Sequence, residues 1–196
     1  MIALIDYGAG NSASVGNALE ELGYEFELTA NESKILAAEK IIFPGVGEAS
    51  SAMATLQRLN LSSVLRMTNK PTLGVCLGMQ LMAERSEEGD AACLGVVPGE
   101  NVAFDPNAVN TPHMGWSETE LTDRDNPLFR DAPERAFFYY AHSYYLPVGE
   151  RTTARCDYGG PFTASIRKDN YYGVQFHPEK SGREGLRILK NFVEFC

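Results

Sequence analysis

The sequence lacks the features of a membrane protein or a nucleic-acid-binding protein. No apolar run approaches the roughly 20 residues that a bilayer-spanning helix needs. The opening segment, residues 1–6, is too short and too soon charged for a signal peptide, and we expect a buried first strand there. Lysine and arginine number 17 against 26 acidic residues, a net charge of -9, whereas nucleic-acid binders usually present a basic surface. We therefore expect neither a membrane protein nor a nucleic-acid binder.

Cysteine is scarce, and no metal-binding pattern is present. The four cysteines include no close pair, and none is spaced with the three histidines as zinc ligands are. A chain of 196 residues can bury a core without disulfides, so we expect reduced cysteines and a cytoplasmic location. We also expect no metal and no cofactor. Cys93, Cys156 and Cys196 are expected to have no chemical role. The segment of residues 8–11 lacks the third glycine of a dinucleotide-binding loop.

Hydrophobic periodicity predicts the fold class. In the first half, strand patterns at residues 2–5, 24–28, 40–43 and 71–75 alternate with helical patterns at 12–22, 49–56 and 59–68. This alternation predicts a parallel sheet with helices on both faces. Residues 136–140, 152–156, 163–166 and 171–175 predict added antiparallel strands, followed by a helix over 183–195. We expect one α/β domain over residues 1–196, with three layers and a mostly parallel central sheet.

Cys76 lies between two glycines at the end of a short apolar run. The order Gly74-Val75-Cys76-Leu77-Gly78 predicts a strand that turns sharply into a helix, as in a nucleophile elbow with cysteine in place of serine. The dipole and free N–H groups at the start of such a helix favour a thiolate. We expect Cys76 to be a nucleophile. The alternative is a core cysteine, since cysteine is among the most buried residue types.

A base for this thiol is expected near the C-terminus. Residues two apart on an extended segment face the same side, so Glu179 can orient the imidazole of His177. The intervening proline favours extended geometry in the residue before it. His113 and His142 lack a carboxylate at this spacing and are expected to be structural. The pattern therefore predicts a hydrolase site built from Cys76, His177 and Glu179.

A glycine-containing loop at residues 44–47 follows another buried strand. Its glycines permit close approach of the backbone to a ligand. Ligands of such sheets bind beyond the carboxyl ends of the strands, so we expect the loop to face Cys76 as part of an oxyanion hole. One donor would be the N–H of Leu77 and the other that of Val46 or Gly47. A plain turn is the alternative.

Six segments resemble the class I glutamine amidotransferases, in the same order along the chain. They are residues 6–11, 44–47, 74–81, 112–116, 142–144 and 175–181, so the resemblance spans essentially the whole chain. Within the family, the Pro-His-Met-Gly-Trp sequence at residues 112–116 is most similar to the glutaminase subunits of imidazole glycerol phosphate synthase.

The resemblance implies a reaction and a substrate. The cysteine would attack the side-chain amide of glutamine, a γ-glutamyl thioester would form, and water would release glutamate after ammonia leaves. Family patterns place Gln80, Glu88 and the backbone of Ser143 and Tyr144 at the glutamine. A carboxylate at Glu88 can pair with the substrate α-ammonium, although a solvated acid is the alternative.

The resemblance also implies a protein partner. Ammonia would pass to a (β/α)8-barrel cyclase, within a heterodimer that makes imidazole glycerol phosphate and aminoimidazole carboxamide ribotide for histidine biosynthesis. Asn11, Trp116, Tyr139 and Lys180 match positions on the cyclase-facing surface, although a lone tryptophan could equally be core. Ser117 departs from the pattern, since the family more often has asparagine there.

Three alternatives remain at this point. A paralogous glutaminase subunit would supply ammonia for another pathway, such as surface-sugar biosynthesis. A non-catalytic binding module would keep the fold without the chemistry, and a cysteine peptidase or deglycase would share the sheet topology. For the preferred function we expect little activity without the partner, because the loop at residues 45–47 is flexible enough to turn an N–H away from the site.

Overall fold

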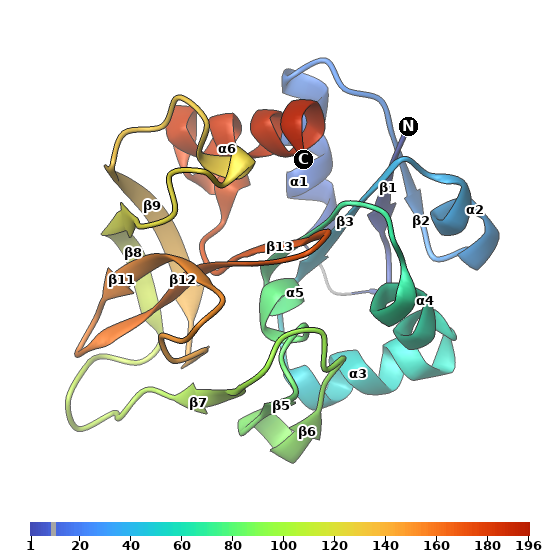
Figure 1. Cartoon of the computed structure of the whole chain (residues 1–196). Helices are drawn as coiled ribbons and strands as arrows, with labels where there is room; N and C mark the ends of the chain where they lie inside the picture. The colour runs from blue at the N-terminus through green and yellow to red at the C-terminus, as the bar shows by residue number, and fades with distance from the viewer. Residues whose placement is uncertain (9–10) are drawn as a thin grey trace.

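A mixed β-sheet forms the middle layer of the protein, for which a computed structural model describes residues 1–8 and 11–196. Across the sheet the strands follow the order β2-β1-β3-β4-β13-β12-β11-β8-β9 (Figure 1). The bounds are β1 Ile2–Ile5, β2 Phe26–Thr29, β3 Lys40–Gly45, β4 Thr72–Cys76, β8 His113–Leu121, β9 Arg135–His142, β11 Thr152–Asp157, β12 Pro161–Lys168 and β13 Tyr171–Val174.

Helices cover both faces of the sheet, as the sequence predicts. Their bounds are α1 Ser12–Glu21, α2 Glu32–Ala37, α3 Ala49–Arg58, α4 Leu61–Met67, α5 Leu77–Gln80 and α6 Gly182–Phe195. Helices α1 and α6 pack on one face, and α3, α4 and α5 pack on the other (Figure 1). The longer helices turn an apolar stripe inward; in α6 the buried stripe includes Ile188, Leu189 and Phe192.

The two halves of the sheet pair differently. Strands β2, β1, β3, β4 and β13 are parallel, whereas β13, β12, β11, β8 and β9 are antiparallel. Strand β13 therefore joins the halves, although the sequence suggests only an antiparallel role for it. At the carboxyl edge of the parallel half, Gly45 of β3 lies opposite Cys76 of β4. This register brings the loop after β3 beside the turn after β4.

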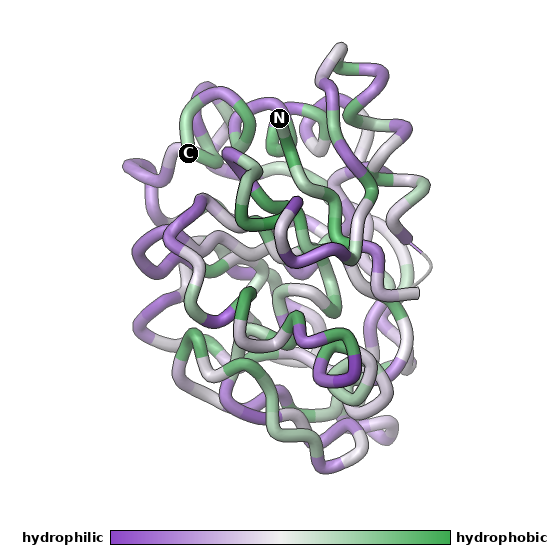
Figure 2. The backbone as a smooth tube through the Cα atoms, turned by 90° about the vertical axis from the view of Figure 1, so that its right-hand side faces the viewer, coloured by the Kyte–Doolittle hydropathy of each residue, from purple (hydrophilic) through white to green (hydrophobic). Residues whose placement is uncertain are grey.

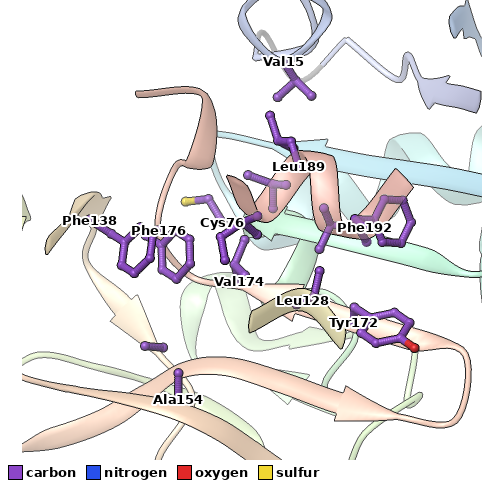
Figure 3. Packing of buried hydrophobic residues seen from close by; sticks show 14 of the residues in the cluster. Val15, Cys76, Leu128, Phe138, Ala154, Tyr172, Val174, Phe176, Leu189 and Phe192 are labelled. Carbon is purple, nitrogen blue, oxygen red and sulfur yellow. The ribbon is translucent and has the colours of Figure 1, made fainter. Parts of the chain in front are cut away.

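Two hydrophobic clusters stabilise this arrangement, one on each side of the sheet. The backbone coloured by hydropathy shows hydrophobic segments concentrated in the interior and hydrophilic ones toward the periphery (Figure 2). Cys76 belongs to the cluster under α1 and α6, where Figure 3 shows it beside Phe176. The ring of Phe176 stacks on that of Phe138, with centroids 3.9 Å apart, so β9 supports the chain that follows β13.

Some short elements escape prediction from periodicity. A second sheet has the order β10-β7-β5-β6, and its strands are too short for alternation to be recognised. These strands are β5 Arg85–Ser86, β6 Ala91–Ala92, β7 Glu100–Ala103 and β10 Tyr144–Tyr145, and the 3-10 turns are η1 Glu88–Asp90, η2 Pro127–Phe129 and η3 Pro178–Lys180. The sequence patterns also do not predict helix α2, although Asn31 caps it by accepting a hydrogen bond from the N–H of Lys34.

The structure bears on the predictions about membrane spans, disulfides and the loop at residues 8–11. Among the residues described, none of the helices has the length and apolar character to span a bilayer. In the same residues the four cysteines form no disulfide, and Cys93 and Cys156 are buried. Within residues 8–11, Ala9 and Gly10 lie outside the described residues.

Candidate active site

Cys76 occupies a strained turn between β4 and α5. Its backbone has φ 54° and ψ -111°, a conformation that is uncommon for a residue with a side chain. The flanking glycines allow this turn, because a Cβ at Gly74 would lie 2.8 Å from the carbonyl oxygen of Gly78. A Cβ at Gly78 would overlap the carbonyl oxygen of Phe43. Helix α5 is a single turn, so the predicted support by a helix dipole reduces to its first free N–H groups.

His177 and Glu179 are in contact, as their spacing predicts. The Nδ1 atom of His177 lies 2.9 Å from Oε1 of Glu179, and both side chains are buried. The local geometry differs from the prediction, because only His177 is extended and Glu179 lies in the 3-10 turn η3. Pro178 explains the difference, since proline begins a helical turn readily. The N–H of His177 donates to the carbonyl of Tyr139 at 2.8 Å, which ties this segment to β9.

The electrostatics of this cluster favour a charged imidazole. Burial acts to lower the pKa of His177, but hydrogen bonding to Cys76 and Glu179, together with their charges, raises it to about 10. Burial also acts to raise the pKa of the Glu179 carboxyl, yet its contact with His177 brings that pKa below its usual value. His177 thus contacts the Glu179 carboxylate at 2.9 Å, while hydrogen bonding to the Cys76 thiol and the charge of that thiol act on its pKa, which makes a thiol–imidazole–carboxylate series. Such a series can perform nucleophilic and acid–base chemistry.

Asn11 is located differently from its predicted place on a partner surface. It is only 5% exposed, and its amide nitrogen donates to Oε1 of Glu179 at 2.9 Å. It stands at the N-cap of α1 but makes no side-chain capping bond there, because the amide is turned toward the carboxylate. Sequence spacing cannot reveal this contact, which joins residues 168 positions apart.

A cavity of about 180 Å³ opens in front of Cys76. Its lining brings together the predicted oxyanion and substrate residues, which are Val46, Gly47, Leu77, Gln80, Glu88, Ser143 and Tyr144. Gly47 has φ 102°, and it lies in an exposed loop with open space around it. These residues come from the loop after β3, from α5, from η1 and from the start of β10. The residues that the resemblance assigns to the oxyanion hole and to glutamine thus line one cavity.

Two residues of this pocket make contacts within the protein that sequence reasoning did not foresee. The amide nitrogen of Gln80 donates to the carbonyl of Tyr144 at 2.6 Å and to the side chain of Gln175 at 3.0 Å. A carboxylate oxygen of Glu88 accepts from the N–H of Ala49 at 2.8 Å, at the start of α3. Burial raises the pKa of Glu88 above its usual value, although the Ala49 bond opposes this.

Gln175 is a site residue that the sequence analysis did not single out. It is fully buried, and its amide nitrogen lies 3.7 Å from Sγ of Cys76. The signal was available, because Gln175 precedes His177 by two positions and alternation places both on one side of an extended chain.

Two predicted interface residues, Trp116 and Tyr139, lie on the outer face of the β8–β9 pair, and Lys180 of η3 lies beside Tyr139. Trp116 and Tyr139 are cross-strand partners whose ring centroids lie 6.3 Å apart, and Nζ of Lys180 lies 5.8 Å from the Tyr139 ring centroid. Trp116 is 55% exposed, so it is not a core residue. Met114 and Phe137 share this face and are also exposed. Four apolar side chains therefore meet at one surface, hereafter the β8–β9 surface: Met114, Trp116, Phe137 and Tyr139.

Comparison with known proteins agrees with this geometry. The sequence profile described as "Glutamine amidotransferase class-I" matches residues 3–195. The chain belongs to this family. Among curated relatives of this amidotransferase, a protein of Bacteroides fragilis is 46% identical over 98% of both chains. One of Vibrio parahaemolyticus is 44% identical over 98% of this chain and 97% of its own. Both are named imidazole glycerol phosphate synthase subunit HisH.

Solved structures confirm the fold of this class I amidotransferase. PurLQS from Thermotoga maritima superposes with a TM-score of 0.76 at 17% identity, covering 99% of this chain and 97% of that one. The glutaminase domain of CTPS from Trypanosoma brucei gives a TM-score of 0.70 at 17% identity, covering 98% and 93%. The predicted three-layer α/β class is therefore confirmed, with a mixed sheet at its centre.

Proposed function

We propose that this glutamine amidotransferase is the glutaminase subunit of imidazole glycerol phosphate synthase in histidine biosynthesis. The observation that carries the proposal is the 44–46% identity, over nearly the whole chain, to curated proteins of that name. A buried thiol, imidazole and carboxylate beside a cavity of suitable lining support the glutaminase chemistry. We take residues 1–196 as one domain, because both helical layers pack on one sheet, and place it in the cytoplasm, where the thiol stays reduced.

In the proposed mechanism, Cys76 attacks the side-chain carbonyl carbon of glutamine as a thiolate paired with the His177 imidazolium. The developing oxyanion accepts hydrogen bonds from the N–H of Leu77 and from that of Val46 or Gly47. The imidazolium then gives its proton to the amide nitrogen, the C–N bond breaks, and ammonia leaves a γ-glutamyl thioester. Throughout, Glu179 holds the imidazole by accepting from Nδ1.

Water completes the cycle. Its oxygen attacks the thioester carbon while His177 takes one of its protons, and the C–S bond breaks to release glutamate and restore the thiolate–imidazolium pair. We propose that Glu88, Gln80 and the backbone at residues 143–144 hold the glutamine during these steps. Since the side chains of Gln80 and Glu88 also bind inside the protein, they act partly by shaping the pocket.

The partner in this proposal is a (β/α)8-barrel cyclase that forms a heterodimer with this chain and receives its ammonia. The β8–β9 surface is the proposed contact, because exposed apolar groups that gather on one face are typical of protein interfaces. In the cyclase, ammonia would react with a phosphoribosyl-formimino aminoimidazole-carboxamide ribonucleotide. Lys180, exposed beside Tyr139, would pair with an acidic group of that partner.

The test is to measure glutamate release with and without a purified cyclase and its ribonucleotide. We expect very low release from this chain alone and a large increase when both are added. Full release without the partner would contradict the coupling, and no release under any condition would contradict the glutaminase assignment. Stable association with a different ammonia-consuming synthase would assign the chain to the other pathway.

A further inference from the structure

Three side chains and one backbone carbonyl form a continuous hydrogen-bond chain that reaches the wall of the cavity. The hydroxyl of Ser117 lies 2.8 Å from Nε2 of His113, and Nδ1 of His113 lies 3.1 Å from Nε2 of His142. Nδ1 of His142 then lies 2.8 Å from the carbonyl oxygen of Tyr144. The hydrogen-bond chain runs from β8, through the end of β9, to Tyr144, and both His142 and Tyr144 line the cavity in front of Cys76.

The Tyr144 carbonyl at the end of this hydrogen-bond chain determines which atom donates and which accepts in every bond. A carbonyl oxygen can only accept, so Nδ1 of His142 must carry a proton. A neutral His142 then has a bare Nε2, which must accept from a protonated Nδ1 of His113. The bare Nε2 of His113 must in turn accept from the Ser117 hydroxyl. Both imidazoles are thereby fixed as the Nδ1-protonated tautomer.

The surroundings keep both imidazoles neutral. Burial lowers the pKa of His113 to about 4 and that of His142 to about 3. The rings of Tyr140 and Tyr158 stack on His113 at 4.9 and 3.9 Å, and the charge of His177 further disfavours a cation at His142. Neither imidazole of the hydrogen-bond chain is therefore a cation near neutral pH.

We propose that Ser117, His113 and His142 are positioning residues that hold the Tyr144 carbonyl, and with it residues 143–144, in place for glutamine binding. This inference rests on the proposed glutaminase function, which names the ligand of the cavity. The Tyr144 carbonyl also accepts from Gln80 at 2.6 Å, so both of its lone pairs are used. Its orientation is thus determined from two sides, by Gln80 and by the histidine chain. This hydrogen-bond chain gives His113 and His142, which the sequence predicts to be structural, a role in positioning residues 143–144.

The first test is independent of activity. In 15N-labelled full-length protein, long-range 1H–15N spectra distinguish the two neutral tautomers and the cation of each histidine. With only three histidines in the sequence, single variants assign the signals. We expect His113 and His142 to be Nδ1-protonated and not to titrate between pH 5 and 8. An Nε2-protonated tautomer, or a pKa near 6.5 for either, would overturn the proposal.

The second test compares two variants of His142 that carry the same amide group on side chains of different length. His142→Asn places an amide donor near the position of Nδ1, whereas His142→Gln places the same group near Nε2. In the complex with cyclase and ribonucleotide, we expect His142→Gln to raise the KM for glutamine roughly tenfold with little change in kcat. His142→Asn should raise it less. Likewise Ser117→Ala should raise KM, and Ser117→Thr, which keeps the hydroxyl, should restore it.

The outcomes separate this inference from the proposed function. If the wild-type complex hydrolyses glutamine and all four variants share its KM, the positioning role is wrong and the function stands. If the wild-type complex does not hydrolyse glutamine, the proposed function fails, while the tautomer measurement still decides the hydrogen-bond chain. Ammonia-dependent synthesis by each variant complex, together with its melting temperature, identifies any variant that has simply misfolded.

Discussion

Gly78 of α5 packs directly against Phe43 of β3, at a place where no side chain fits: a Cβ there would overlap the carbonyl oxygen of Phe43. This contact draws the turn that carries Cys76 against the neighbouring strand. It also places the N–H groups at the start of α5 beside the loop that follows β3. The close approach therefore defines the proposed oxyanion site.

Gly78→Ala should move this turn away from β3. Because backbone atoms block the new methyl group, we expect a loss of stability of about 1–3 kcal/mol and a large loss of glutaminase activity. Chemical denaturation and steady-state assays measure the two effects. Gly149→Ala is the matched control, since its Cβ would lie 3.9 Å from the nearest atom. Equal stability and activity of the two variants would show that the close approach of Gly78 to Phe43 does not position Cys76.

Asn11→Ala should reduce glutaminase activity through Glu179. Removing a hydrogen bond to a charged carboxylate loosens the group that holds His177, and we expect kcat/KM to fall roughly 10- to 100-fold. The kcat/KM of Asn11→Asp should fall further, because this substitution adds a negative charge beside Glu179. Asn17→Ala, an exposed asparagine on the same helix, should match the wild type. An unchanged kcat/KM in Asn11→Ala would show that Glu179 needs no such support.

Cys76→Ala should lower the pKa of His177. In the wild type, contacts with Cys76 and Glu179 raise this pKa from 6.5 to about 10. The stabilisation from this raised pKa is complete below about pH 6.5 and is lost as the pH rises through about 10. An NMR titration of His177 in both proteins measures the change. A pKa that is identical with and without the thiol would contradict the proposed pair.

Trp116→Ala and Phe137→Ala should weaken binding to the cyclase without unfolding the protein. Both side chains are more than half exposed, so their loss creates no core cavity. If Trp116 is a central anchor, we expect a loss of about 2 kcal/mol, roughly a 30-fold higher Kd. Met67→Ala provides the control, since Met67 is 80% exposed at the end of α4. Titration calorimetry should give Met67→Ala the same Kd as the wild type. An equally raised Kd in all three variants would argue against a specific contact at the β8–β9 surface.

The sequence predicts the parts of this site that depend on local pattern. The turn at Cys76 follows from glycine spacing, and the contact between His177 and Glu179 follows from their separation by one residue. The parallel core strands and the amphipathic α1 and α6 follow from periodicity. These features need only neighbouring residues or one regular repeat to be recognised.

Contacts between distant segments were not predictable in the same way. The burial of Asn11 depends on the packing of α1 against η3, and the bond from Gln80 to Tyr144 joins α5 to a two-residue strand. The link between His113 and His142 exists because β8 and β9 pair in the register that makes them cross-strand partners. Strand register and the packing of distant segments depend on the whole fold, so patterns in a single sequence do not predict them.

The most direct test of the central claim uses Cys76→Ala in the complex with the cyclase. We expect that synthesis of imidazole glycerol phosphate from glutamine is abolished, while synthesis from added ammonium salt continues at the wild-type rate. Persistent glutamine-dependent synthesis would contradict the assignment of Cys76 as the nucleophile. Loss of both activities would show that the thiol supports the structure rather than the chemistry.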